Sequence, residues 1–236
     1  MNTEELYALK DRAYKTAIAH GFHEEVRPDA YWLGLVMSEM GEAINADRKG
    51  LHANVKGFRA DATLGIDFKE RFEKNIKDSV EDKIADIIIR LLDFAGLRGY
   101  ELSTDENLSS FILSALEELK TSGMPGLLLI FTYALVYNFR LGNLECCVCR
   151  TIRILSGCFE EMTGSDKDLW WFIEQKMKYN ELRPKFKELI ENEIKENLKV
   201  KIRPEDGGYV VVELLYKDEV IDSDWMVDIG LNPLDE

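Results

Sequence analysis

The chain has 236 residues, of which 46% are hydrophobic and 10% aromatic, so it is long and apolar enough to bury a core of its own. Its net charge is −14, with acidic and basic residues interleaved, which disfavours a nucleic-acid partner and suits a protein that attracts cations. No apolar run approaches the ~20 residues of a membrane span. The N-terminal stretch MNTEELYALK lacks the layout of a signal peptide. We therefore expect a cytoplasmic protein with no membrane partner.

Helical periodicity dominates the first 198 residues and predicts an all-α helical bundle. The segments with helical spacing are 3–20, 29–48, 67–98, 106–122, 125–140, 143–162, 167–182 and 185–198. Residues 51–66 have no clear period and predict a long loop. Beyond the turn-like residues 205–208, short β-branched runs predict a small β-element between 199 and 225. The expected domains are a helical domain, 1–198, and a β-containing C-terminal extension, 199–236.

Two of these segments also predict an assembly. Residues 125–140 (PGLLLIFTYALVYNFR) and 143–162 are apolar on more sides than one small bundle can cover. An apolar face that the chain itself does not bury is typical of a subunit interface. We therefore expect a homodimer with a helical interface.

Two carboxylates occupy unexpected positions in the segment 29–48. Glu39 and Glu42 lie three positions apart in the stretch SEMGEA. At ~100° per residue, the side chains on the same helix face as Glu39 are Trp32, Leu35, Ala43 and Ala46. Glu42 lies at the margin of this face. Such a pair alone is typical of a solvated face, but a buried ionised carboxylate is costly unless a cation pairs with it.

A second acidic stripe lies on the segment VEDKIADIIIRLLDFAG, whose apolar residues cover most of the helix and predict a position in the middle of the bundle. The polar stripe consists of Ser79, Asp82, Asp86, Arg90 and Asp93. Acids on two helices would converge as hard oxygen ligands for Mg²⁺ or Mn²⁺. The three histidines are expected away from this stripe, which disfavours zinc or iron. Alternatively, Arg90 neutralises the acids in a purely structural network.

A third group of polar residues lies far along the chain. Lys176, Asn180 and Arg183 lie on one side of a predicted helix that ends at Pro184. Two cations and an amide at a helix end can bind phosphate oxygens, and arginine can do so bidentately. Without other support, the same spacing is typical of a solubilising surface.

Taken together, the three stretches resemble the MazG-like all-α NTP pyrophosphatase superfamily from about residue 20 to 184. HGFHEEVRPDAYWLGLVMSEMGEAINADRKG is similar to the segment that carries its Glu-x-x-Glu motif. VEDKIADIIIRLLDFAGLRG is similar to its acidic second helix, and KMKYNELRP to its closing Lys-Met-x-Tyr-Asn-x-x-Arg-Pro. The order and separation of the three stretches make the resemblance specific.

The resemblance implies a Mg²⁺-dependent hydrolase that splits nucleoside triphosphates between the α and β phosphates, releasing a monophosphate and pyrophosphate. It also implies a helical bundle that works as a dimer or tetramer. The resemblance implies Glu39, Glu42 and Asp86 as metal ligands, and Asp82 is the expected fourth because it lies on the same helix face as Asp86, with Mn²⁺ able to replace Mg²⁺. Glu39 or Glu42 would also orient the attacking water. The expected substrate-binding residues are Lys176, Asn180, Arg183 and Arg90. Trp32, on the same helix face as Glu39, would stack the base, although a core position is the commoner one for a tryptophan.

One position departs from the motif. The second helix of the family usually supplies Glu-x-x-Asp, but the residue three before Asp86 is Lys83. Asp82, one turn before Asp86, would then act as the fourth ligand. Alternatively, Lys83 occupies the place of the cation, and the chain is a nucleotide-binding or assembly protein without the activity. A third possibility is a helical scaffold in which the acidic stripe only pairs with Arg90.

Overall fold

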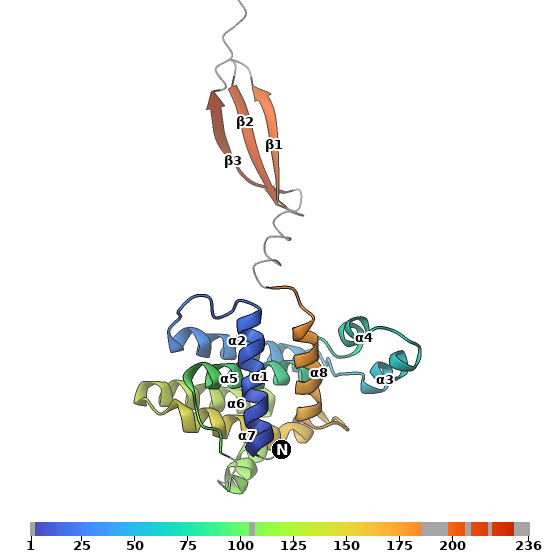
Figure 1. The fold of residues 1–236 in the computed structure, drawn as a ribbon, viewed down its shortest axis with the longest axis vertical. Coiled ribbons are helices and arrows are strands. Elements are labelled where there is room, and N and C mark those ends of the chain that lie inside the picture. Colours follow the sequence, from blue (N-terminus) through green and yellow to red (C-terminus); the bar gives the residue numbers. More distant parts are fainter. Residues whose placement is uncertain (1–2, 104–106, 186–197, 206–208, 217–218, 229–236) are drawn as a thin grey trace, which may run out of the picture. The chain divides into compact units, whose positions relative to one another are not determined.

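The computed structural model describes the backbone of residues 3–103, 107–185, 198–205, 209–216 and 219–228. Contacts divide the chain into two compact units, residues 1–183 and 184–236 (Figure 1). This division falls before the boundary expected at 198 and 199. The predicted helix 185–198 lies almost entirely outside the described residues.

The first unit is all-α, as the periodicity predicts. Its helices are α1 (Thr3–Ala19), α2 (Asp29–Arg48), α3 (Val55–Thr63), α4 (Phe68–Asn75), α5 (Val80–Arg98), α6 (Ser109–Leu141), α7 (Leu144–Thr163) and α8 (Leu169–Glu181). Helix α5 lies at the centre and contacts α1, α2, α7 and α8 (Figure 1). The short helices α3 and α4 lie together at one side.

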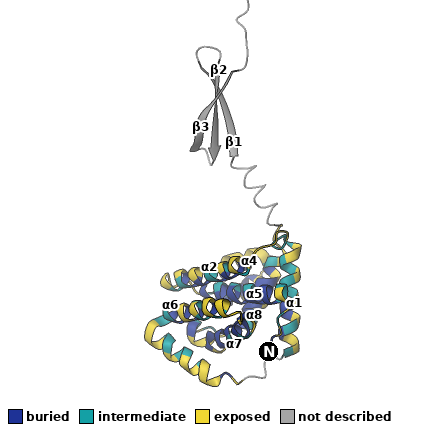
Figure 2. Cartoon of the chain, turned by 90° about the vertical axis from the view of Figure 1, so that its left-hand side faces the viewer, coloured by how far each residue is buried: buried dark blue, intermediate teal, exposed yellow. Residues whose placement is uncertain are grey.

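The burial of α5 confirms that it is a central helix. Ile84, Ile88 and Leu92 have no exposed surface, and most of α5 is buried in Figure 2. Burying one such side chain stabilises the fold by about 1.5–3 kcal/mol. The helix begins at the cap Ser79, whose side chain accepts a hydrogen bond from the backbone N–H of Asp82. It ends at Gly99, whose positive φ of 67° suits a left-handed cap.

Two expectations about the segment 51–98 are wrong. Residues 55–63 form α3 rather than a loop, because Asn54 caps the helix and Phe58 packs edge-on against Phe68 and Trp171. These aromatic contacts are tertiary, so the local pattern does not reveal them. The predicted helix 67–98 is two helices, since Asp78 has a left-handed φ of 63° and Ser79 starts α5 anew.

Helix α6 contains the expected break. Gly123 has a non-helical backbone (φ 67°, ψ −172°), so Ser109–Leu141 is two helical segments joined at a kink, with Pro125 starting the second. Among the described residues, α6 is the one helix long and apolar enough to cross a membrane, and 28% of its apolar window is buried. Length and composition alone are weak support for a span. Figure 2 shows that much of α6 is exposed.

The second unit contains the predicted β-element as a three-stranded antiparallel sheet. The strands are β1 (Leu198–Glu205), β2 (Tyr209–Tyr216) and β3 (Glu219–Asp228), in the order β1-β2-β3. Leu198 pairs with Tyr216, and Tyr209 pairs with Asp228. The register of β2 against β3 shifts between Val212 and Leu215, which indicates a bulge.

Candidate functional site

Charged side chains from α2, α5 and α8 converge in the helical unit. The charged cluster consists of Glu39 and Glu42 from α2, Asp82, Lys83, Asp86 and Arg90 from α5, and Lys176 from α8. Because α5 packs against both α2 and α8, three stretches far apart in the sequence meet at one place. Side chains of both acidic stripes therefore lie in one cluster, where they pair with lysine and arginine rather than with one another as a set of metal ligands.

Lys176 is buried in the charged cluster, where it lies between two aspartates of α5. Its Nζ lies 2.9 Å from Oδ1 of Asp82 and 2.8 Å from Oδ2 of Asp86. Burial alone would lower the pKa of this ammonium group, but the two carboxylates outweigh burial and raise it. Lys176 is therefore charged and held inside the protein rather than presented to a phosphate.

Asp82 has no exposed side-chain surface. Its carboxylate accepts hydrogen bonds from Nζ of Lys176 and from the backbone N–H of Asp78. Burial raises its pKa to about 6, although Lys176 acts in the opposite direction. These contacts use the Asp82 carboxylate as an internal partner, so the structure does not favour it as a fourth metal ligand.

Lys83 lies within the cluster rather than in solvent. Its Nζ is 2.7 Å from Oε2 of Glu42 and 3.3 Å from Oδ1 of Asp78, and its side chain is only 14% exposed. Burial disfavours the charged form, but the hydrogen bond to Glu42 and the field of Asp86 outweigh it and raise the pKa. The ammonium group is therefore firmly charged.

Glu39 is largely enclosed by the bundle, as its place on the helix face predicts. Its side chain is 13% exposed, against 50% for Glu42. Arg90 lies 3.3 Å away, from Nε to Oε1 of Glu39. Burial and the neighbouring Asp86 carboxylate raise the pKa of Glu39, while Arg90 partly opposes them. Arg90 thus pairs with a glutamate of α2, not with the aspartates of its own helix.

The residues do not fit a resident Mg²⁺ in this arrangement. Each of Glu39, Glu42, Asp82 and Asp86 pairs with a lysine or arginine of the cluster. In the described part of the chain, no group of three or more histidine, cysteine, aspartate or glutamate side chains is placed to hold a metal ion. The donor oxygens are those that Mg²⁺ prefers, but ammonium and guanidinium groups already satisfy them.

The remaining predicted residues have different surroundings. Asn180 has a buried Oδ1 without a hydrogen-bond partner among the described residues, and Arg183 is exposed at the end of α8. Trp32 is 4% exposed, and its ring packs 4.7 Å from that of His23 and 5.2 Å from that of Tyr31. Its expected stacking on a base is therefore wrong, because core side chains already cover the indole.

A buried histidine–aspartate pair that the sequence pattern does not reveal lies at the polar stripe of α5. Nε2 of His23 lies 2.7 Å from Oδ1 of Asp93, and both side chains are less than a tenth exposed. The expectation that no histidine lies near the polar stripe is therefore wrong. His23 is in the connection between α1 and α2, and no local spacing relates it to α5. Burial raises the pKa of Asp93, with His23 acting in the opposite direction.

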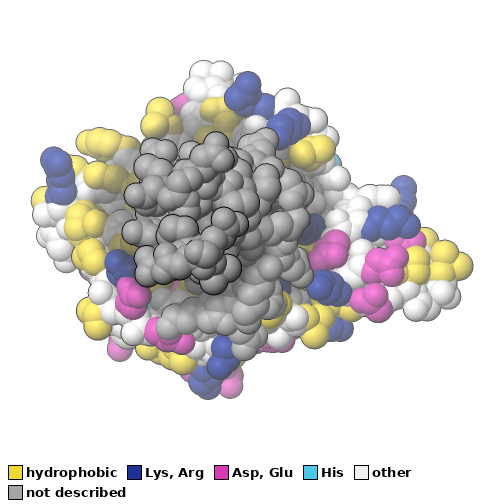
Figure 3. Space-filling model, turned by 90° about the horizontal axis from the view of Figure 1, so that it is seen from above, with side chains coloured by type: hydrophobic (Ala, Val, Ile, Leu, Met, Phe, Trp, Pro, Cys, Tyr) yellow, Lys and Arg dark blue, Asp and Glu magenta, His cyan; other side chains and the backbone are white. Residues whose placement is uncertain are grey.

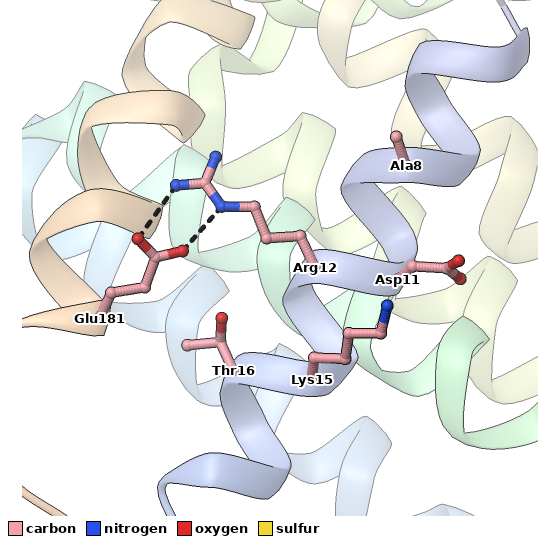
Figure 4. A pocket seen from close by; sticks show the side chains of 6 residues that line it. All are labelled: Ala8, Asp11, Arg12, Lys15, Thr16 and Glu181. Carbon is pink, nitrogen blue, oxygen red and sulfur yellow. Dashed lines mark hydrogen bonds and ion pairs between the residues drawn. The ribbon is translucent and has the colours of Figure 1, made fainter.

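A surface depression lies apart from the charged cluster. Its lining consists of Ala8, Asp11, Arg12, Lys15, Thr16 and Glu181 (Figure 4). Arg12 binds Glu181 through Nε at 2.7 Å and Glu174 through Nη1 at 2.7 Å. These partners neutralise the guanidinium, so the depression lies at a packing contact between α1 and α8.

No family model, curated protein or solved structure matches the chain. The charged cluster and the motif resemblance are thus the basis for a functional proposal.

Proposed function

We propose that the chain binds nucleoside triphosphates at the charged cluster and hydrolyses them at the α–β phosphate bond, releasing a monophosphate and pyrophosphate. One observation carries this proposal. The three stretches that resemble pyrophosphatase motifs bring Glu39, Asp86 and Lys176 together from three different helices. Scattered surface charges would have no reason to converge in this way.

The chain's own residues have distinct roles in this proposal. Glu42 is half exposed, and Glu39 has a raised pKa, so this pair would accept the proton of an attacking water. Arg183 would bind phosphate oxygens and stabilise the charge on departing pyrophosphate. Asn180, with its unpaired amide oxygen, would orient the nucleotide. A nucleoside triphosphate carries Mg²⁺ bound to its own phosphates, and that ion enters as part of the substrate.

Nucleic acid is not the proposed partner. Figure 3 shows acidic and basic side chains interspersed over the visible described face, without a basic stripe. Together with the net charge of −14, this favours a small nucleotide over a polyphosphate backbone.

A second candidate is a nucleotide-binding protein that does not turn its ligand over. The observation in its favour is the ion pair between Lys83 and Glu42, at 2.7 Å, because it engages a carboxylate that hydrolysis requires. Under this alternative, the protein binds a nucleoside triphosphate and releases it unchanged.

A paired measurement separates the two candidates. The purified chain is titrated calorimetrically with each of the eight natural NTPs and dNTPs in the presence of Mg²⁺, and the same mixtures are assayed for pyrophosphate and phosphate. Hydrolysis predicts pyrophosphate without phosphate from at least one nucleotide. Binding without pyrophosphate supports the second candidate, and the absence of both binding and release contradicts both.

A further inference from the structure

Lys83 holds two acidic elements together at the edge of the charged cluster. Its ammonium group contacts Glu42 on α2 and Asp78 in the turn before α5, at 2.7 and 3.3 Å. A cation that bridges carboxylates from separate elements performs the same electrostatic task as a bound metal ion. Lys83 does so from within the chain.

The charge of the cluster supports this comparison. With Asp78 included, five carboxylates face two ammonium groups and one guanidinium, which leaves two net negative charges. A glutamate at position 83 would leave four negative charges, and one bound divalent ion would return the net charge to minus two. Lysine at position 83 therefore gives the same net charge as glutamate together with a divalent ion.

We propose that Lys83 is a tethered substitute for a resident divalent ion. The nucleotide-free protein then binds neither Mg²⁺ nor Mn²⁺ at the charged cluster, and Lys83→Glu creates a site lined by Glu39, Glu42 and Asp86. The meaning of this inference for catalysis rests on the proposed function, since the sole metal in the reaction would be the ion that the nucleotide brings. The binding behaviour itself does not depend on turnover.

The test is a titration of the full-length, nucleotide-free chain with Mn²⁺, in which free Mn²⁺ is measured by electron paramagnetic resonance. The proteins are wild type, Lys83→Glu, Lys83→Gln and the control Lys120→Glu, which makes the same charge change at an exposed position of α6. We expect Lys83→Glu to gain one saturable site, on the order of 100-fold tighter than any Mn²⁺ binding in wild type or control. We expect the Mn²⁺ affinity of Lys83→Gln to fall between those of wild type and Lys83→Glu. Adding Glu39→Gln to Lys83→Glu should remove the site.

Two results would overturn the proposal. One is a saturable Mn²⁺ site in wild type that Glu39→Gln abolishes. The other is a folded Lys83→Glu protein that binds Mn²⁺ no better than Lys120→Glu. Circular dichroism checks that each variant folds. If Lys83→Glu does not fold, Lys83→Gln is the test: tighter Mn²⁺ binding than in wild type supports the proposal, and equal binding overturns it. Because no nucleotide is present, the Mn²⁺ titration does not depend on hydrolysis. Absence of pyrophosphate release would contradict the proposed function and not this inference, and absence of the new Mn²⁺ site would contradict this inference and not the proposed function.

Discussion

Lys176 on α8 donates a hydrogen bond from Nζ to the carboxylate of Asp82 on α5 at 2.9 Å, and both side chains are buried. This pair ties the last helix of the helical unit to its central helix. Lys176→Met would leave the buried Asp82 and the partly buried Asp86 without their shared cation. We expect it to lower the free energy of unfolding by about 3–5 kcal/mol, measured by urea denaturation.

The matched control for that prediction is the double variant Lys176→Met with Asp82→Asn, which removes the more deeply buried of the two uncompensated charges. It should recover part of the loss. A single Lys176→Met variant as stable as wild type would show that the pair is not an important stabilising contact.

The stability of the protein should also depend on the protonation of Asp82. Its folded-state pKa is about 6, above the ordinary value, so the folded chain binds this proton more tightly than the unfolded chain. The resulting stabilisation is present at low pH and is lost as the pH rises through about 6. Glu39 has the same direction of shift.

Asp82→Asn removes this contribution. Between pH 4.5 and pH 7, wild type should lose about 2 kcal/mol more unfolding free energy than Asp82→Asn does. Urea titrations of both proteins at a series of pH values give the difference. Parallel curves for the two proteins would mean that Asp82 does not titrate in this range.

The packing of α1 against α5 depends on a glycine. A Cβ added at Gly96 would lie 2.6 Å from Cβ of Tyr14, too close for either backbone to remain in place. Gly96→Ala should therefore destabilise the fold by about 1–3 kcal/mol. At Gly34, in α2, an added Cβ meets nothing within 4 Å, so Gly34→Ala should stabilise by roughly 0.5–1 kcal/mol. The stabilities of the two variants are compared by thermal unfolding. Equal changes in the midpoint temperature would contradict the close contact between position 96 and Tyr14.

The sequence predicts the helices of the bundle well because their apolar spacing is a local property. The central position of α5 follows from Ile84, Ile88 and Leu92, which leave it little polar surface. The break at Asp78 is not predictable in this way, since apolar spacing continues through it. Helix α3 is likewise missed, because Phe58 obtains its partners from α4 and α8.

The sequence predicts which residues form the charged cluster, but not which ion pairs they make. The spacing of Glu39, Asp86 and Lys176 places each on a particular helix face, and the structure brings these faces together. Which cation binds which acid depends on how α2, α5 and α8 pack, and no single segment contains that information. The contact of His23 with Asp93 has the same origin, because 70 residues separate the partners.

The exposed side of α6 should form a homodimer interface. Leu129, Tyr133 and Tyr137 form a stripe along its second segment, and Leu129 and Tyr133 are each about two-thirds exposed. We expect multi-angle light scattering at micromolar concentration to give twice the mass of one chain for wild type. For Tyr133→Glu we expect the mass of a single chain. A wild-type monomer in solution would contradict the dimer, and binding to lipid vesicles would point to a membrane instead.

The proposed hydrolysis is tested by the initial rate of pyrophosphate release from nucleoside triphosphates. The rate is measured for wild type, Glu39→Gln and the control Glu117→Gln, which makes the same exchange at an exposed position of α6. The proposed hydrolysis predicts release by wild type and by Glu117→Gln, and a loss on the order of 100-fold or more in Glu39→Gln. Equal rates in all three proteins, or no release by a folded wild-type chain, would contradict it.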